Sequence, residues 1–338
     1  MTAVAPSALD HPAALSLARR HRLRIWEPLP WILGIAFYVF FPKYLGFGTE
    51  VLVTILFAIS LDLVLGYAGI VTLGHAAFFG AGAYTVGMLA KHGIWNEPIT
   101  SLILAALVAA AVGVGSGLVL LRTQGLTLLM LTLCTMALLE EAANLGSRYT
   151  GGFDGLDSLP IAPLFGVFEF NPLYPKTQYL YVLTVLFLAF AFVRTLVYSP
   201  FGQSLTGIRE NTLRMHAVGA PVRARLVVCY ALSAAIAGSA GGIWAQANAY
   251  VNLNTLGLDR AATVLIILVL GGYGRLYGAF VGAVAYMALS HFLAKIYPTA
   301  WQLGLGLLLV VIALFARNGI LGIAEALRRR LASTGSAS

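Results

Sequence analysis

Charged residues are scarce in this sequence, at 10% of its 338 residues, whereas hydrophobic residues make up 59%. A composition this apolar excludes an ordinary soluble domain. A run of roughly 18 or more apolar residues is long enough to cross a bilayer as a helix, and the chain contains about ten such runs. They fall at residues 29–47, 49–67, 70–90, 98–120, 125–145, 177–197, 225–247, 259–273, 276–294 and 300–316. The eighth is short enough to be re-entrant.

We therefore predict an all-α fold, a polytopic transmembrane helical bundle with broken glycine-rich segments. Residues 1–28 would form a basic N-terminal tail, residues 29–317 the transmembrane domain, and residues 318–338 a C-terminal tail. Both tails are expected in the cytoplasm, because most arginines then lie on the cytoplasmic side. Within the domain we expect an external loop at 146–178 and a polar cytoplasmic segment at 198–224.

The basic excess, a formal net charge of +8, follows from this orientation. Its arginines would lie near anionic lipid headgroups at the cytoplasmic surface. The same charge could suggest a nucleic-acid partner, but its distribution over the loops of a membrane protein argues against one.

Cysteine and lysine are also rare. The two cysteines, Cys134 and Cys229, both fall in apolar runs, so neither a disulfide framework nor a metal site is expected. No P-loop motif is present, and the four lysines all fall in segments assigned to the outside. A P-loop lysine must reach the nucleotide phosphates. We therefore expect no cofactor bound by this chain, and any ATP-Mg would be hydrolysed on other subunits.

Glycine, by contrast, is abundant, with 36 residues. Three Gly-x-x-x-Gly patterns, at 113–117, 238–242 and 278–282, indicate close helix–helix packing. Two longer stretches resemble each other, Leu63-Val-Leu-Gly-Tyr-Ala-Gly69 and Leu268-Val-Leu-Gly-Gly-Tyr-Gly274. Paired helix breaks often line the substrate path of a transporter, although a chance repeat of glycine-rich sequence is an alternative.

Candidate residues of a translocation pathway lie in and around these two stretches. Charged groups at membrane depth usually face a cavity or a partner. For the aspartate a structural hydrogen-bonding role is an equal alternative, and for the histidine a packed, hydrogen-bonded position is the stronger one. No nucleophile with a supporting base accompanies them, so we do not expect an enzyme. The candidates are Asp62, Gly66, Tyr67, Gly69, His75, Gly271 and Gly274.

The polar segment at 198–224 predicts a cytoplasmic helix. Ser199-Pro200 is typical of a helix start, and Gly219 followed by Pro221 is typical of a stop. Apolar side chains recur between them at helical spacing. One interpretation is an interfacial helix lying on lipid. The other is a rigid cytoplasmic element that transmits motion from a partner protein.

Four motifs, in order along the chain, resemble the membrane permease of branched-chain amino acid ABC transporters, M-type (LivM-like). They are Gly66-Tyr-Ala-Gly69 with Leu73-Gly-His-Ala-Ala-Phe-Phe-Gly80, Thr150-Gly-Gly-x-x-Gly155-Leu, Ser199-Pro-Phe-Gly-x-x-Leu-x-x-Ile208-Arg-Glu-Asn211, and Leu270-Gly-Gly-x-Gly274. The resemblance covers roughly residues 45–325. It implies a permease subunit in a bacterial inner (plasma) membrane that works as a heterodimer with a related H-type permease, two ABC ATPase subunits and an external substrate-binding protein.

The resemblance further implies that the segment around 203–219 is a coupling helix seated on the ATPase. Its expected contact residues are Arg209, Glu210, Asn211, Arg214 and Gly219. The Glu-Ala-Ala-x-x-x-Gly motif of ABC importers is degenerate here, because Leu213-Arg-Met215 stands where Glu-Ala-Ala would be. The implied cargo is leucine, isoleucine or valine. Urea or short amides are alternatives, as is a secondary transporter driven by protons through Asp62 and His75.

Overall fold

The computed structural model describes residues 28–163 and 175–296, and a few isolated positions between 303 and 322. In these ranges the secondary structure is helical apart from one antiparallel bridge. Seven helical segments there are long and apolar enough to cross a membrane: Pro42–Tyr67, Pro98–Leu120, Leu126–Leu145, Lys176–Tyr198, Val222–Asn248, Leu253–Gly271 and Gly278–Ile296. The predicted all-helical membrane fold is therefore confirmed.

The predicted count of about ten spans remains a prediction, as does the orientation of the termini. The tenth run, 300–316, lies almost entirely outside the described residues, as do most of the two predicted tails. The boundary between the first two predicted runs was wrong. Helix α2 covers only Leu29–Phe40, and α3 already begins at Leu45. Pro42 lies between them and starts a short 3₁₀ turn, consistent with the preference of proline for helix starts.

The third predicted run, 70–90, is helical only from Ala76, where α4 (Ala76–Lys91) begins. Helix α3 (Leu45–Asp62) continues into the π-helical turn η2 (Leu63–Tyr67), and residues 68–75 are largely non-helical. A similar interruption separates α12 (Leu258–Gly271) from α13 (Gly278–Ile296). Both expected glycine-rich breaks are therefore present.

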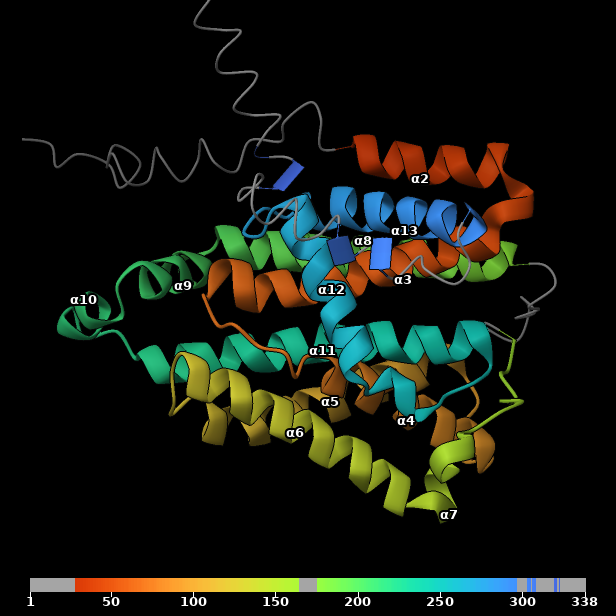
Figure 1. Ribbon diagram of the computed structural model, residues 1–338, viewed down its shortest axis with the longest axis horizontal. Coiled ribbons are helices and arrows are strands. Elements are labelled where there is room, and N and C mark those ends of the chain that lie inside the picture. The colour runs from red at the N-terminus through yellow and green to blue at the C-terminus, as the bar shows by residue number, and fades with distance from the viewer. Residues whose placement is uncertain are drawn as a thin grey trace, which may run out of the picture.

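Most of the long helices run roughly along the long axis of the molecule (Figure 1). They include α5 (Pro98–Leu120), α6 (Leu126–Leu145), α8 (Lys176–Tyr198) and α11 (Val222–Asn248). Two short helices, α9 (Pro200–Glu210) and α10 (Thr212–Ala217), project at one end, which we call the α9 end. The short α7 (Ser147–Thr150) lies at the opposite end, the α7 end.

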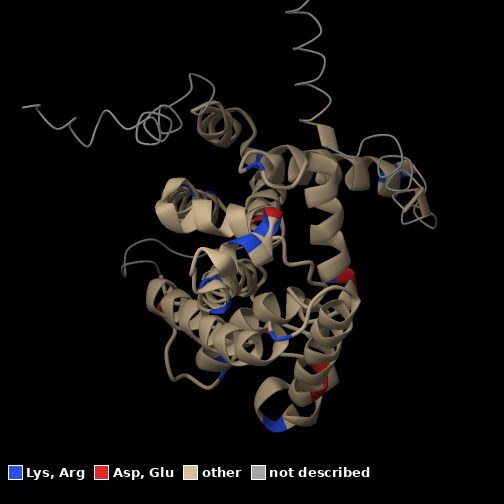
Figure 2. Ribbon diagram, turned by 90° about the vertical axis from the view of Figure 1, so that its left-hand side faces the viewer, with Lys and Arg blue, Asp and Glu red and all other residues tan. Residues whose placement is uncertain are grey.

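Helix α3 lies near the centre of the bundle and α6 at its edge. In the most apolar stretch of the Pro42–Tyr67 segment, 78% of the residues are buried inside the protein. In the corresponding stretch of α6 only 17% are buried. An apolar face left exposed on a membrane helix is suited to contact with lipid chains or a partner subunit. Viewed from the α9 end, most of the ribbon carries no charge (Figure 2).

Glycines bring α4, α5 and α11 into close contact, as their spacing predicted. Gly82 of α4 packs against the backbone of Gly238, and Gly241 packs against the Phe79 carbonyl. A Cβ atom on Gly113 would lie 2.6 Å from the Ala234 Cβ. Small residues at these positions allow the helix backbones to approach closely, which stabilises the bundle through dispersion contacts.

At the α7 end, the loop that follows α7 is joined to the connection between α11 and α12. Leu156 and Val251 exchange backbone hydrogen bonds, with N···O distances of 2.7 and 2.8 Å. Lys91, at the end of α4, forms an ion pair at 3.3 Å with Asp157. These contacts join the loop to the end of α4 and to the connection between α11 and α12. They extend over part of the predicted external loop 146–178, of which residues 164–174 lie outside the described ranges.

Candidate functional site

The polar segment after α8 forms two helices where the sequence predicted one. The start is as predicted, because the Ser199 side chain accepts a hydrogen bond from the Gly202 N–H at 3.4 Å and Pro200 is the first helical residue. The helix stops at Asn211, whose backbone is extended, with φ −157° and ψ 97°. Its side-chain oxygen accepts from the Arg214 N–H at 2.9 Å. Asparagine competes with the helix in this way and favours caps, which explains the break.

The two helices differ in how they contact the bundle. On α9, Leu205 and Ile208 are buried. On α10 no residue is buried, and Leu213 is 83% exposed. Helix α9 is therefore anchored by its apolar stripe, whereas α10 presents an unpartnered surface beyond the bundle (Figure 1).

Arg209, near the end of α9, joins this segment to the first glycine-rich break. Its guanidinium donates a hydrogen bond to the Gly66 carbonyl oxygen. Its aliphatic stem lies alongside Gly69, where an added Cβ atom would be 2.5 Å from the Arg209 Cγ. Gly69 also has φ +73°, in the left-handed region that favours glycine. Because the last carbonyls of a helix lack helical partners, the end of η2 offers an acceptor that arginine can reach.

Asp62, one turn before Gly66, joins the first break to the second. Its carboxylate Oδ1 accepts a hydrogen bond from the Gly274 N–H at 2.6 Å, and the residue is 1% exposed. Gly274 has φ +75°, and a Cβ atom there would lie 3.2 Å from the Arg209 Nη1. The α9 segment and both breaks therefore meet in one cluster, which we call the junction: Asp62, Gly66, Gly69, Arg209 and Gly274.

Some predicted site residues lie beside the junction without belonging to it. Tyr67 is half-buried, close to the Leu276 backbone of the second break. Gly271 packs against Gly278 and Gly282 and brings α12 close to α13. The remaining coupling candidates are exposed on α9, α10 and the turn after them, and within the described ranges their side chains form no hydrogen bond to the two breaks: Glu210, Asn211, Arg214 and Gly219.

His75 lies apart, at the start of α4. It is 1% exposed, its Nε2 is 2.9 Å from the Ser60 Oγ, and its ring stacks on Phe57. His75 and Asp62 thus have separate partners, and the described residues show no hydrogen bond between them. This arrangement agrees with a packed, hydrogen-bonded histidine and gives no direct proton relay between the two groups.

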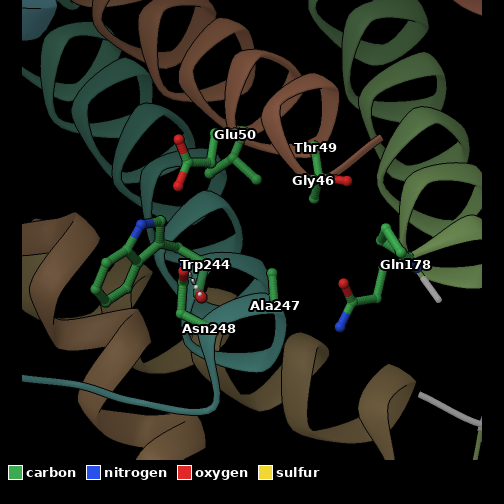
Figure 3. A pocket seen from close by; sticks show the side chains of 9 residues that line it. Gly46, Thr49, Glu50, Gln178, Trp244, Ala247 and Asn248 are labelled. Carbon is green, nitrogen blue, oxygen red and sulfur yellow. Dashed lines mark hydrogen bonds between the residues drawn. The ribbon is translucent and has the colours of Figure 1, made fainter. Parts of the chain in front are cut away.

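A second polar feature, which the sequence reasoning missed, lies at the α7 end. A cavity of about 140 Å³ is lined by residues of α3, α8 and α11: Gly46, Thr49, Glu50, Val53, Pro175, Gln178, Trp244, Ala247 and Asn248. In Figure 3, Glu50 and Trp244 lie on one side of it and Gln178 on the other. Arg260 lies with its guanidinium 5.1 Å from the Trp244 ring centroid. The available signal was that Glu50 and Arg260 are ionisable residues inside apolar runs.

Known proteins with similar sequences agree with the motifs. A family model described as "Branched-chain amino acid transport system / permease component" matches residues 44–314. The chain belongs to this family. The match spans all four motifs, the junction and the cavity.

Curated relatives of this permease carry similar names. One relative is the high-affinity branched-chain amino acid transport system permease protein LivM of Salmonella typhimurium. This chain is 29% identical to it over 298 residues, which cover 81% of this chain and 69% of the relative. The Escherichia coli LivM protein is 26% identical with the same coverage. A probable branched-chain amino acid transport permease protein LivM of Methanocaldococcus jannaschii is 26% identical, covering 74% of this chain and 81% of the relative. No solved structure matches the chain.

The family identifies the permease as a multi-pass membrane component of a transport system rather than an enzyme. Among the described residues, no group of three or more His, Cys, Asp or Glu side chains could hold a metal ion. Asp62 is buried at the junction, Arg260 is half-buried beside the cavity, and Arg209 and Glu50 are exposed. We interpret these charged residues in terms of transport.

Proposed function

We propose that this chain is the permease subunit of an ATP-driven importer of branched-chain amino acids in a bacterial inner membrane. It forms half of the translocation pathway together with a related H-type permease. Two ABC ATPase subunits supply the energy, and an external binding protein delivers the substrate. Family membership and the names of the LivM relatives support this proposal, as does the absence of a P-loop from the sequence.

The observation that carries the coupling part of the proposal is the hydrogen bond from Arg209 to Gly66. Helix α10 is the exposed element that the ATPase would contact at the cytoplasmic face. It follows directly after α9, which is anchored on the bundle. A displacement of α10 would move Arg209 relative to Gly66 and Gly69. Because Asp62 connects the same segment to Gly274, the second break would move as well.

The energetics of the junction suit a two-state element. A hydrogen bond to a charged group contributes on the order of 1.5–3 kcal/mol to stability. Two such bonds hold one arrangement firmly, yet they are weak enough for an ATPase that binds the two arrangements with different affinity to replace them. The largely non-helical residues 68–75 between η2 and α4 give the chain a segment in which a shift need not bend a helix.

The test is uptake by the complete complex, with both permeases, the ATPases and the binding protein, in vesicles whose proton gradient has been dissipated. We expect ATP-dependent accumulation of leucine, isoleucine or valine under these conditions. If transport is lost when the proton gradient is dissipated, that result would instead support the proton-driven alternative. Uptake of urea or short amides, with no competition from leucine, would change the proposed cargo while keeping the mechanism.

A further inference from the structure

Two opposite charges flank the cavity at the α7 end without neutralising each other. Glu50 is on α3 and Arg260 on α12, and within the described ranges neither side chain has a hydrogen bond or ion pair. Both side chains lie beside Trp244: Glu50 lines the same cavity as this ring, and the Arg260 guanidinium, which is not itself a lining group, lies 5.1 Å from the ring centroid. Ionisable groups inside membrane spans are costly and are retained for a partner. An acid and a base held near each other, but not in contact, leave room for a group that carries both charges.

Aromatic rings flank Arg260, and the cavity beside it has both polar and apolar walls. The Arg260 guanidinium lies 5.1 Å from the Trp244 ring centroid and 5.2 Å from that of Phe79. These rings hold the cation over their faces and restrict its position. Trp244 also forms a wall of the cavity, and buried Val53 adds an apolar surface to it. A ligand for this site therefore needs a positive group, a negative group and a short apolar body.

We propose that the cavity between α3, α8 and α11 is a binding site for a free α-amino acid within the permease. Glu50 accepts hydrogen bonds from the ammonium group, Arg260 binds the carboxylate, and Val53 and Trp244 contact the aliphatic side chain. The paired donors of a guanidinium match the two oxygens of a carboxylate. This inference rests on the proposed transport of amino acids and adds to it a substrate site that belongs to the permease itself.

The site lies at the opposite end of the bundle from the junction. Its lining residues come from the first half of α3, the start of α8 and the end of α11, and Arg260 lies on the first turn of α12. If the α9 end is cytoplasmic, the cavity opens toward the side where the binding protein releases its substrate. An amino acid could then bind here before the junction changes its arrangement.

The first experiment measures protection of a thiol inside the cavity. Ala247→Cys is introduced together with Cys134→Ser, which removes the exposed native thiol and leaves the buried Cys229. The assembled transporter, without binding protein or ATP, is alkylated with a maleimide. We expect millimolar leucine to slow alkylation several-fold, whereas leucine amide and 4-methylpentanoate, which each lack one charge, do not. Equal protection by all three compounds, or by none, would overturn the proposal.

The second experiment asks whether the two charges act on the ligand. Glu50→Gln and Arg260→Gln should each abolish protection and raise the KM for leucine uptake by about 10-fold or more, as expected for loss of a charged hydrogen bond. Asp259→Asn, the exposed neighbour of Arg260, is the matched control and should leave both values unchanged. If the Arg260→Gln variant does not assemble, Arg260→Lys is used instead, because it keeps the positive charge. We expect this variant to show partial protection by leucine.

A charge swap separates the site from a purely structural pair. Glu50→Arg combined with Arg260→Glu would restore assembly and uptake if the two side chains only balanced each other or a partner subunit, and that result would contradict the proposal. Failure of the wild-type complex to take up leucine, with protection intact, would refute the proposed function but not the site. Normal uptake without protection would refute the site alone.

Discussion

The carboxylate of Asp62 accepts a hydrogen bond from the backbone N–H of Gly274, which lies 212 residues away along the chain. Both residues belong to helix breaks, and Arg209 contacts both breaks from the α9 segment. The element proposed to face the ATPase and the interruptions proposed to line the pathway therefore share one set of contacts. This relationship leads to the predictions that follow.

Replacing Arg209 with alanine should uncouple the transporter. The variant loses the hydrogen bond to Gly66, so motion of the ATPase would no longer be transmitted to the breaks. Leucine uptake per ATP hydrolysed should then fall by roughly 10-fold, the effect expected for loss of one charged hydrogen bond. Uptake and hydrolysis are measured together in proteoliposomes. Arg122→Ala is the control for charge, because Arg122 is exposed just after α5 and its side chain donates to the Leu118 carbonyl rather than to the breaks. Equal loss in both variants would show that charge at the ATPase surface matters, rather than the junction.

Asp62 should act through its oxygen rather than its charge. Asp62→Asn keeps an acceptor for the Gly274 N–H, whereas Asp62→Ala leaves that donor unpaired at a cost of about 1–3 kcal/mol. We expect the alanine variant to unfold at a lower temperature in detergent and the asparagine variant to remain close to wild type. The asparagine variant should also keep ATP-driven uptake. A stable Asp62→Asn complex without transport would instead support a proton-carrying role.

Gly69→Ala should disturb coupling indirectly, by displacing Arg209. A Cβ atom at Gly69 meets the stem of Arg209 at 2.5 Å, and φ is +73°. Gly93 has a similar φ of +66° but open space around it, so Gly93→Ala isolates the backbone strain of about 1–2 kcal/mol. Uptake is expected to fall in Gly69→Ala and to change little in Gly93→Ala.

A double-mutant cycle tests this explanation. Once Arg209 has been replaced by alanine, adding Gly69→Ala should have a much smaller further effect, because the clashing side chain is gone. Additive losses of uptake would mean that Gly69 acts independently of Arg209.

The helix break at Asn211 should depend on its side chain. Asn211→Ala removes the cap of α10, which costs about 1 kcal/mol, and α10 should then exchange its amide hydrogens faster. Asn211→Asp retains an acceptor and serves as the control. Hydrogen exchange over residues 212–217 measures the effect, and unchanged protection in the alanine variant would contradict it.

The contact between α4 and α11 should tolerate no side chain at Gly241. A Cβ atom there meets the Phe79 carbonyl, so Gly241→Ala forces backbone shifts that cost roughly 1–3 kcal/mol. Gly115→Ala, on α5 with nothing within 4 Å of its Cβ, should stabilise its helix by up to about 1 kcal/mol. Thermal unfolding of the solubilised protein compares the two, and equal melting temperatures would show that α11 can move aside.

Several features were predictable from the sequence because they depend on local pattern. The length and apolarity of the runs identified the membrane helices, glycine spacing identified close packing, and Ser199-Pro200 identified the start of α9. The two breaks were also predictable, because glycine and positive φ go together. The single helix across 200–217 was wrong, since helical spacing of apolar residues outweighed the capping tendency of Asn211.

The pairings of the candidate site could not be predicted in this way. Arg209 and Gly66 are 143 residues apart, and they were assigned to separate roles, one in coupling and one in the pathway. Glu50 and Arg260 were overlooked, because each alone is compatible with a charged residue at the end of a span.

The sequence by itself determined that this chain is a helical membrane permease, because hydrophobic length and ordered motifs can be recognised without knowing where the helices lie. Only the tertiary structure decided that α9 contacts both breaks at one end and that an acid and a base flank a cavity at the other. The physical reason is that the relative placement of helices follows from how small residues let their backbones approach, a property of pairs of segments and not of either one alone.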